Sequence, residues 1–457
     1  MGVLAAMGQR LVSFCERFRG HFGSQTRTVE AAASGYLKGL IQAERKNMER
    51  MEEVVPEVNE QALQHMLSES AWAEQAVLAQ VAREADRHLG GKPESCLLID
   101  ESGFPKKGQC SVGVARQWCG QLGKVENCQV GVFAALGCGA QATLIAERLF
   151  LPEAWTADPE RCRAAGVPTD ELEFKRKHDL ALELVAQARS QRLGYAWVGF
   201  DGLYGEDPAF LRTLADRGEI FVGDVHKDQR LYLADPKPSV PPPTSPRGRQ
   251  PSRLQAQTPS IRVDQWAQRQ PSEAWQRITL RDSTKGALQV DVLHRRVWLW
   301  DGEETEAREW HVLVRREVDT PIQLKYSLSN APADTSTARL AFMQGQRYWI
   351  ERALQNAKQD VGLGDYQVRG WRGWHHHMAL VMMAMLFMLE ERLLHQDTRP
   401  LLSGTDIRAL LNHFLPRRDT TFEEVLRQME LRHRKRQAGI DSANRKQRLT
   451  NIVEPDG

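Results

Sequence analysis

The sequence predicts an α/β protein in which a mixed-sheet core follows a helical N-terminal region and is interrupted by a β-rich insertion. Residues 1–92 have the apolar spacing of amphipathic helices throughout. From residue 93 onward, short apolar runs alternate with helical patterns, which is typical of an α/β core. A Pro-rich stretch and a segment rich in β-branched and aromatic residues then separate this core from its last helices.

The bulk composition excludes several classes of protein. With 457 residues, of which 41% are hydrophobic, the chain can bury a substantial core in several domains. Its net charge of only +2 means that any affinity for nucleic acid must come from local patches. The seven cysteines are odd in number and contain no C-x-x-C pair. This pattern favours reduced thiols in the cytoplasm over disulfides or a zinc site.

Neither secretion nor membrane insertion is expected. The first residues lack the cationic leader, apolar core and cleavage site of a signal peptide. The longest apolar run, Met378–Leu389, is too short to cross a bilayer and is expected to be a buried core helix. We therefore expect a cytoplasmic protein without a membrane partner.

Residues 1–92 are expected to form a helical N-terminal DNA-binding domain. Two amphipathic runs flank a serine-rich break at Ser68–Ser70, which fits a helix-turn-helix, although an ordinary helical hairpin has the same pattern.

Residues 93–235 are expected to form the first part of the core. The predicted order is three strands, a helix, a strand, a helix and a strand, over 95–100, 129–136, 142–151, 172–191, 196–201, 206–218 and 219–226. In a sheet of this order the first and fourth strands lie side by side. Each of these two strands ends in an acid, Asp100 in the first and Asp201 in the fourth.

The remaining sequence divides into three parts. Residues 236–335 hold the Pro-rich linker, which cannot be a central strand or helix, and the β-rich insertion. Residues 336–395 complete the core with a helix over 347–361 that carries Glu351, and with the Met-rich helix. Residues 396–457 form a basic helical region, in which the run from Arg427 to Arg448 has eight Lys or Arg against two acids.

Asp100, Asp201 and Glu351 are the candidate catalytic residues and metal ligands. Acids at strand ends often only cap loops, but here the predicted topology can bring two strand ends together, and a helix packed across the sheet can add the third carboxylate. Hard oxygen donors that converge on one cleft suit Mg²⁺. Two such ions roughly 3.5–4 Å apart would activate a nucleophilic water or hydroxyl and stabilise the leaving oxygen in phosphoryl transfer.

Five stretches resemble a known family. They are LLIDESGFPKKG, SVGVARQWCGQLGKVENCQVGV, VGFDGLYGEDPAFL, RYWIERALQNAKQDVGLGDYQVRGW and WHHHMALVM. Over roughly residues 30–395 the chain resembles bacterial insertion-sequence transposases of the DDE class, nearest to the IS-four and IS-seven-hundred-one type. This resemblance implies an RNase H-like core with a β-rich insertion before the catalytic Glu. It places the three acids of the family on Asp100, Asp201 and Glu351, and the insertion accounts for the long separation between the last two.

The resemblance also implies the reaction and its partners. A DDE transposase cleaves at the terminal inverted repeats of its element and joins the freed 3′ ends to target DNA without a covalent enzyme intermediate. The implied cofactor is Mg²⁺, with Mn²⁺ as a substitute, at two ions per active site, and no small-molecule cofactor is implied. The implied partner is double-stranded DNA bound by a homodimer on paired ends, in the bacterial cytoplasm at the nucleoid. The alternatives are an RNase H-like nuclease that only hydrolyses, and a domesticated DNA-binding regulator, although the intact acid triad argues against the latter.

The family signature around the Glu is Tyr, two residues, Arg, three residues, Glu, six residues and Lys. Arg347, Glu351 and Lys358 match it, whereas the Tyr position holds Gln344, which leaves any role of that Tyr unassigned. The three matching residues share one face of the predicted helix. A solvated helix with an Arg–Glu pair at i, i+4 would look the same. The resemblance instead implies that Glu351 binds metal while Arg347 and Lys358 face DNA phosphate.

Other acids nearby have alternative explanations. Glu101 rivals Asp100 as a ligand, but adjacent strand residues point to opposite faces, and Ser102 then shares the face of Asp100, as the D-x-Ser/Thr pattern of the family implies. Asp207 is expected to cap a helix before Pro208. Asp224 is expected to form a salt bridge rather than to bind metal.

The DNA contacts are expected from basic and aromatic side chains. The glycine-rich loop after Asp100 carries four cations suited to a phosphate-lined cleft, unless it is only a basic hairpin: Lys106, Lys107, Arg116 and Lys124. The Pro-rich linker (Arg247, Arg249, Arg253) and the run Arg432–Arg436 are further candidates for backbone contacts, or simply solvated charge.

Trp298 and Trp300 share one face of a predicted insertion strand, while Val297 and Leu299 can supply its buried side. The two indoles either pack in a small β-core or dimer contact, or stack on a base displaced beside the cut, as the resemblance implies for an aromatic of this insertion.

Overall fold

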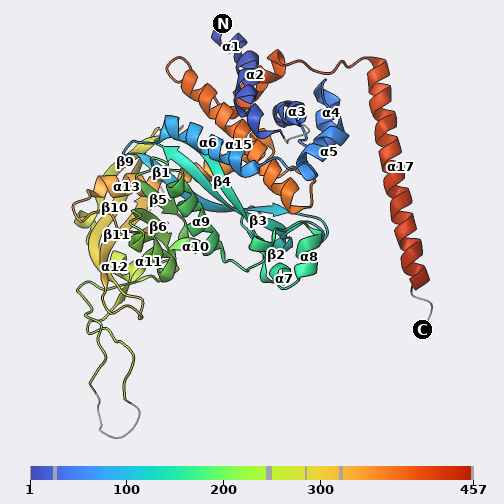
Figure 1. The fold of residues 1–457 in the computed structure, drawn as a ribbon. Coiled ribbons are helices and arrows are strands. Elements are labelled where there is room, and N and C mark those ends of the chain that lie inside the picture. The colour runs from blue at the N-terminus through green and yellow to red at the C-terminus, as the bar shows by residue number, and fades with distance from the viewer. Residues whose placement is uncertain (1, 24–27, 243–249, 284–285, 319–322, 454–457) are drawn as a thin grey trace.

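A large mixed β-sheet runs through the molecule, and helices from distant parts of the sequence pack against it (Figure 1). The computed structural model describes residues 2–23, 28–242, 250–283, 286–318 and 323–453. The sheet has the order β2-β3-β1-β5-β6-β12-β11-β10-β9, and β4 pairs with β3. The expected α/β fold with a mixed, RNase H-like sheet is therefore confirmed.

The strands of the core follow the predicted order. They are β1 (Ser95–Pro105), β2 (Ala115–Cys119), β3 (Lys124–Cys138), β4 (Gln141–Phe150), β5 (Trp197–Phe200) and β6 (Phe221–Val225). β1 pairs antiparallel with β3 and parallel with β5, so the first and fourth predicted strands do lie side by side. β2 was not predicted. It forms inside the glycine-rich loop and pairs with the start of β3 as a hairpin.

The strands of the insertion extend the core sheet. They are β9 (Gln276–Ser283), β10 (Gly286–Leu299), β11 (Arg308–Glu317) and β12 (Leu324–Ser329). β12 pairs antiparallel with β6, which joins the insertion to the core by backbone hydrogen bonds. A small separate sheet, β7 (Arg230–Leu231) with β8 (Ile261–Arg262), precedes α12 (Val263–Gln268). The described residues that follow β7 and precede β8, 232–242 and 250–260, extend away from the body (Figure 1).

Several helices pack against the sheet. Those that follow core strands are α7 (Glu153–Thr156), α8 (Pro159–Ala164), α9 (Lys177–Ser190), α10 (Gly202–Gly205) and α11 (Pro208–Asp216). Those that follow the insertion are α13 (Thr337–Gln346), α14 (Tyr348–Val361) and α15 (Trp371–Leu394). α14 contacts β1, β3 and β4, while α13 contacts both β6 and the insertion strands β9, β10 and β11. The junction between α13 and α14 therefore lies where the core and the insertion meet.

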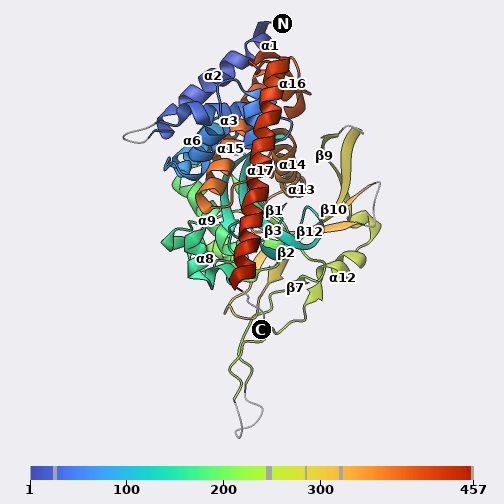
Figure 2. The same ribbon diagram turned by 90° about the vertical axis from the view of Figure 1, so that its right-hand side faces the viewer.

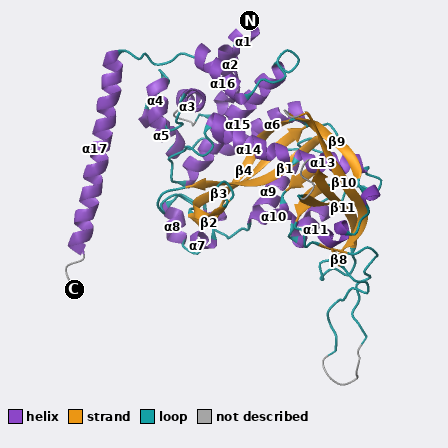
Figure 3. Cartoon of the chain, turned by 180° about the vertical axis from the view of Figure 1, so that it is seen from behind, coloured by secondary structure: helices purple, strands orange, loops and turns teal. Residues whose placement is uncertain are grey.

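The N-terminal and C-terminal helices gather at one end of the sheet (Figure 3). They are α1 (Gly2–Ala5), α2 (Met7–Phe18), α3 (Glu30–Gln42), α4 (Met48–Val54), α5 (Glu60–Ser68), α6 (Glu74–Leu89) and α16 (Gly404–Phe414), and α17 (Phe422–Val453) follows them. α6 contacts α15 and the strands β3 and β4, so the second helix of the candidate helix-turn-helix is part of the core packing. α17 is a long helix that stands beside the rest of the molecule (Figures 1 and 2).

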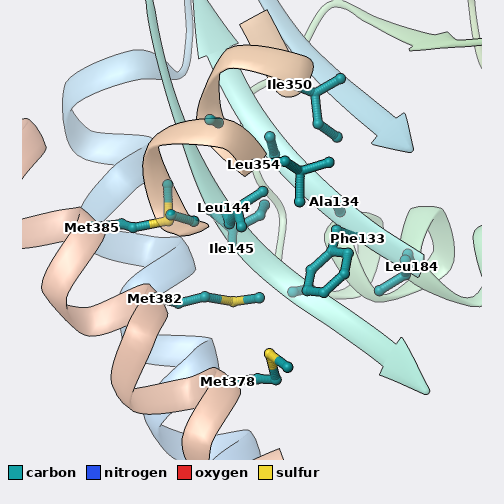
Figure 4. Packing of buried hydrophobic residues seen from close by; sticks show 14 of the residues in the cluster. Phe133, Ala134, Leu144, Ile145, Leu184, Ile350, Leu354, Met378, Met382 and Met385 are labelled. Atoms are coloured by element: carbon teal, nitrogen blue, oxygen red, sulfur yellow. The ribbon is translucent and has the colours of Figure 1, made fainter. Parts of the chain in front are cut away.

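The Met-rich helix α15 is the centre of the hydrophobic core, as predicted. All residues from Gly373 to Leu389 are buried, including Met378, Met382 and Met385. Figure 4 shows these methionines directed from α15 towards the packed side chains of the strands and of α14. The three histidines at its start are buried with internal partners, since His375 bonds Glu147 and His377 bonds Tyr36. Among the described residues, no helix is long and apolar enough to cross a membrane.

Candidate active site

The strand register aligns the acids at one edge of the sheet. In the parallel pair β1 and β5, Leu98 lies opposite Gly199. Two residues further along the same register, Asp100 and Asp201 come opposite each other. β5 and β6 pair in parallel with Phe200 opposite Gly223, so one further residue brings Asp201 opposite Asp224. Three aspartates therefore lie in a row across three adjacent strands, with Asp100 inside β1, Asp201 just after β5 and Asp224 near the end of β6.

Asp100 and Asp201 repel each other. Burial and the charge of Asp201 raise the pKa of Asp100 well above its usual value. Burial, followed by the charge of Glu101, raises the pKa of Asp201 to about 6. The carboxylate of Asp201 also accepts a hydrogen bond of 3.0 Å from the backbone N–H of Leu203, which caps α10 and orients the side chain. Crowded, partly buried carboxylates with raised pKa values are typical of functional sites.

Glu101 points to other partners. Its carboxylate lies 3.0 Å from the ammonium of Lys177 and 3.2 Å from the hydroxyl of Tyr204. These contacts come from α9 and α10, so both oxygens of Glu101 are already engaged within the protein. The assignment of Asp100 rather than Glu101 as a metal ligand stays a prediction, and this geometry supports it.

Glu351 is linked to the aspartates by a salt bridge to Arg347, which also contacts Asp224. Arg347 lies between α13 and α14, and its guanidinium is 2.9 Å from Asp224 and 2.7 Å from Glu351. The charges of Asp224, Glu351, Asp100 and Asp201 all raise the pKa of Arg347. Only 20% of the Arg347 side chain is exposed, against 47% for Glu351. In this conformation Arg347 is thus the countercharge of the acid cluster, and the salt bridge expected for Asp224 is present.

Gln344, at the position where the family signature has Tyr, is connected to Asp224 through two successive hydrogen bonds. Its amide donates to the hydroxyl of Ser327 at 2.6 Å, and that hydroxyl donates to Asp224 at 2.6 Å. Ser327 lies opposite Asp224 in the β6–β12 pair, so the insertion supplies this contact. The sequence did not reveal this chain, because its members come from β6, β12 and the α13–α14 junction.

Two of the three predicted ligands fit a divalent cation. Asp100 and Asp201 offer hard oxygen donors, and their mutual repulsion would be relieved by a cation. No group of three or more Asp, Glu, His or Cys side chains within the described part of the chain is arranged to hold a metal ion. Glu351 would join the two aspartates only after its carboxylate leaves Arg347, so its role as a ligand stays a prediction.

Lys358 lies beside the β2–β3 hairpin. Its ammonium donates to the side chain of Gln121 at 3.1 Å and lies 5.7 Å from the ring centroid of Phe104. Burial lowers the pKa of Lys358, and the charges of Cys119 and Asp100 oppose that shift. The structure therefore places Lys358 between the hairpin and the acid cluster. Its contact with a DNA phosphate stays a prediction.

The four cations of the glycine-rich loop differ in position. Lys107 and Arg116 are exposed, and Lys124 pairs with Glu126 at 3.2 Å. Lys106 instead turns inward, 3.4 Å from the ring centroid of Tyr366, and burial lowers its pKa to about 8. Lys106, Lys107 and Arg369 line a cleft of about 780 Å³ between the core and α5.

Trp298 and Trp300 are partly buried, whereas Val297 and Leu299 are buried, as the alternation predicted. The Trp300 indole N–H donates to the backbone carbonyl of Glu304 at 2.7 Å, and its ring lies 6.5 Å from that of Tyr232. Trp298 is bridged to Tyr232 through the backbone. Of the other basic candidates, Arg247 and Arg249 lie outside the described residues.

A mixed sheet with aspartates at the ends of adjacent parallel strands, and a glutamate on a later helix packed across them, defines the RNase H-like class of DDE enzymes. Residues 17–287 match the family model of the DDE superfamily endonucleases, and this match includes Asp100 and Asp201. The chain belongs to this family. A protein of Microchaete diplosiphon, described as a probable transposase for insertion sequence element IS701, is 23% identical over 356 residues, which are 78% of this chain and 80% of the relative. The predicted DDE transposase class is confirmed, and this class implies a divalent metal ion.

Proposed function

We propose that this enzyme is a transposase that cleaves DNA at the terminal inverted repeats of an insertion sequence and joins the 3′ ends to target DNA. The observation that carries the proposal is the strand register that brings Asp100 opposite Asp201 at one sheet edge. The relative described as a probable IS701 transposase supports the same assignment. The substrate of both steps is double-stranded DNA, and we expect a homodimer to hold the paired ends.

In this proposal Asp100 and Asp201 hold Mg²⁺, or Mn²⁺ as a substitute, and Glu351 completes the site. Two bound ions would activate the attacking oxygen and stabilise the leaving oxygen of an in-line displacement. Before DNA binds, Arg347 bridges Asp224 and Glu351 and offsets part of the negative charge of the site, and Glu351 leaves Arg347 when it joins the two aspartates. Tyr204 and Lys177 hold Glu101 away from the ligand position. Lys358 and the exposed cations of the hairpin contact the backbone phosphates, which position the DNA.

The proposal is tested with Asp100→Ala, Asp201→Ala and Glu351→Ala. Each variant is expected to lose Mg²⁺-dependent cleavage of DNA that carries the ends of the element. Each should retain most of its affinity for that DNA, because affinity comes from phosphate contacts elsewhere. Glu206→Gln is the matched control, since Glu206 is exposed and lies only five residues after Asp201. Near-normal cleavage by any of the three alanine variants would remove that residue from the set of ligands.

A strand-transfer assay separates the proposal from hydrolysis alone. Pre-cleaved ends with free 3′-hydroxyls are incubated with a supercoiled target plasmid and Mg²⁺. A transposase joins the ends to the plasmid, whereas a nuclease that only hydrolyses produces nicks without joined products. A domesticated DNA-binding regulator would bind the ends but yield neither product.

A further inference from the structure

A cavity opens between the insertion strands and the start of α14, beside the acid cluster. It measures about 80 Å³, several times the roughly 10–15 Å³ that one water molecule needs. Four cations and three carboxylates are among its lining residues: Arg281, Arg315, Lys325, Arg347, Asp224, Glu317 and Glu351. None of the cations contributed by the insertion belongs to the family signature around Glu351.

Arg315 of β11 is a buried cation without a close anion. Only 7% of the residue is exposed, and burial lowers the pKa of its guanidinium. Among the described residues, this guanidinium forms neither a hydrogen bond nor an ion pair. Its Nη1 lies 3.8 Å from the position that a Cβ on Gly345 would occupy, so the absence of a side chain at Gly345 leaves room beside the guanidinium. A buried charge of this kind is costly unless an anion pairs with it.

The remaining charges make the cavity electropositive. Arg347 is already neutralised by Asp224 and Glu351. The four lining cations outnumber the three lining carboxylates by one, and the charges of both Asp224 and Glu317 act on Arg315. Lys325 lies opposite Arg315 in the β11–β12 pair, and the guanidinium of Arg281 stacks 3.7 Å from the ring centroid of Tyr348. Three cations from β9, β11 and β12 of the insertion thus line one small polar cavity.

We propose that this cavity is an anion-binding subsite that receives one backbone phosphate of DNA, with Arg315 as its buried donor and Arg281 and Lys325 at its rim. The identity of the ligand as DNA rests on the proposed function. A guanidinium offers two parallel N–H donors to the oxygens of a phosphate. Because Arg347 and Glu351 line this cavity and also belong to the acid cluster, DNA anchored here continues directly to the acids.

The test measures the affinity for a short fluorescent DNA duplex at several salt concentrations, in EDTA so that no cleavage occurs. Loss of one phosphate contact lowers the slope of log K against log salt by about 0.9. Arg315→Gln is expected to show this loss, and Arg315→Lys is expected to restore most of the slope because it keeps the charge. Arg295→Gln is the matched control, since Arg295 is an exposed arginine of β10 that does not line the cavity.

The results for the Arg315 and Arg281 variants either support or overturn the phosphate subsite. If Arg315→Gln does not fold, as judged by circular dichroism, Arg281→Gln at the rim carries the same prediction. An unchanged slope for both glutamine variants overturns the subsite. A second outcome combines unchanged slopes with a phosphate effect on stability, in which inorganic phosphate raises the Tm of the wild type but not that of the glutamine variants. In that case the cavity binds a free anion, and its assignment to DNA is overturned. Because binding is measured without cleavage, failure of the subsite is distinguishable from failure of the proposed chemistry.

Discussion

Arg347 connects carboxylates from two separate elements. It bonds Asp224 at the end of β6 and Glu351 on α14, and the charges of Asp100 and Asp201 also act on it. The Arg–Glu pair at i, i+4 that a simple solvated helix would show is present, but Asp224 anchors the same guanidinium. The expected contact of Arg347 with DNA phosphate stays a prediction. The structure adds that two nitrogens of the Arg347 guanidinium, Nε and Nη1, already contact carboxylates.

At the residue scale, Asp224 is expected to act as a positioning residue for Arg347. Asp224→Asn removes the charge that holds the guanidinium, so we expect cleavage to fall by roughly 10–100-fold, the usual cost of losing a group that orients active-site residues. DNA binding in EDTA should change little. Rates are measured with saturating DNA and Mg²⁺. Ser327→Ala is the matched variant, because it keeps the charge of Asp224 and removes only the neutral hydrogen bonds of Ser327 to Asp224 and from Gln344, each worth about 1 kcal/mol, so it should slow cleavage less. Full activity of Asp224→Asn would refute the positioning role.

Asp201 is expected to lower the stability of the fold in the absence of metal. Its pKa is about 6 in the folded protein, against about 3.9 in an unfolded chain. Between these values the folded state binds more protons, so stability falls as the pH rises from about 4 to 6, and the full penalty of up to ~3 kcal/mol persists above pH 6.

Asp201→Asn removes this penalty and can still cap α10 through its side-chain oxygen. We expect urea unfolding in EDTA to show a more stable variant by about 1–3 kcal/mol above pH 6, with little difference near pH 4. Equal stability of the two proteins at both pH values would show that Asp201 is not strained in the fold.

At the scale of elements, Trp298 and Trp300 pack at the C-terminal end of β10. The Trp300 indole bonds the carbonyl of Glu304 and packs near Tyr232, so this ring has partners inside the protein. We expect Trp300→Ala to destabilise the protein by about 2–4 kcal/mol, somewhat less than the loss of a fully buried Trp. The folded fraction should cut DNA at a near-normal rate. Urea unfolding and a cleavage assay check both expectations.

The alternative for these rings is stacking on a displaced base. Base–aromatic stacking is worth about 1–3 kcal/mol, so a stacking residue would slow cutting by roughly 5- to 150-fold when replaced by Ala. A folded Trp298→Ala or Trp300→Ala variant that cuts slowly, and gains little from an abasic substrate, would establish stacking for that residue. This result would contradict the structural role expected for Trp300.

At the scale of the whole molecule, α17 is attached mainly by polar contacts. Arg432 pairs with Glu53 at 2.6 Å, and Lys435 pairs with Glu60. Phe422 remains 71% exposed. Surface ion pairs are worth about 0–1 kcal/mol each, so a chain that ends before α17 should keep its fold, with Tm within ~5 °C of the full protein.

The same truncation should weaken DNA binding. α17 carries the basic run from Arg427 to Arg448, so its loss should reduce the salt dependence of affinity by about one unit for each phosphate contact removed. Full-length protein with Arg434→Gln and Arg436→Gln is the matched comparison, because both arginines are exposed. An unchanged slope in both proteins would mean that the basic run is only solvated charge.

The sequence by itself determined the local parts of this protein. Alternating and helical apolar patterns located the core strands, α9, α11 and the buried α15, because these periodicities follow directly from the geometry of a strand or a helix. They also placed Asp201 at the end of a strand and Glu351 on a helix, whereas the prediction that the first strand ends at Asp100 was wrong, because β1 continues to Pro105 by pairing with β3. β2 was missed because its residues alternate weakly among glycines and charges, so its pairing depends on β3.

Only the tertiary structure decided which distant side chains meet. The Asp224–Arg347 pair and the Gln344–Ser327 contact each join residues of different elements. The buried Arg315 lies beside a cavity lined by several elements. These contacts depend on the sheet order, in which β12 of the insertion lies against β6 of the core. Apolar periodicity specifies the buried face of each strand, but it does not specify which other strand becomes its neighbour.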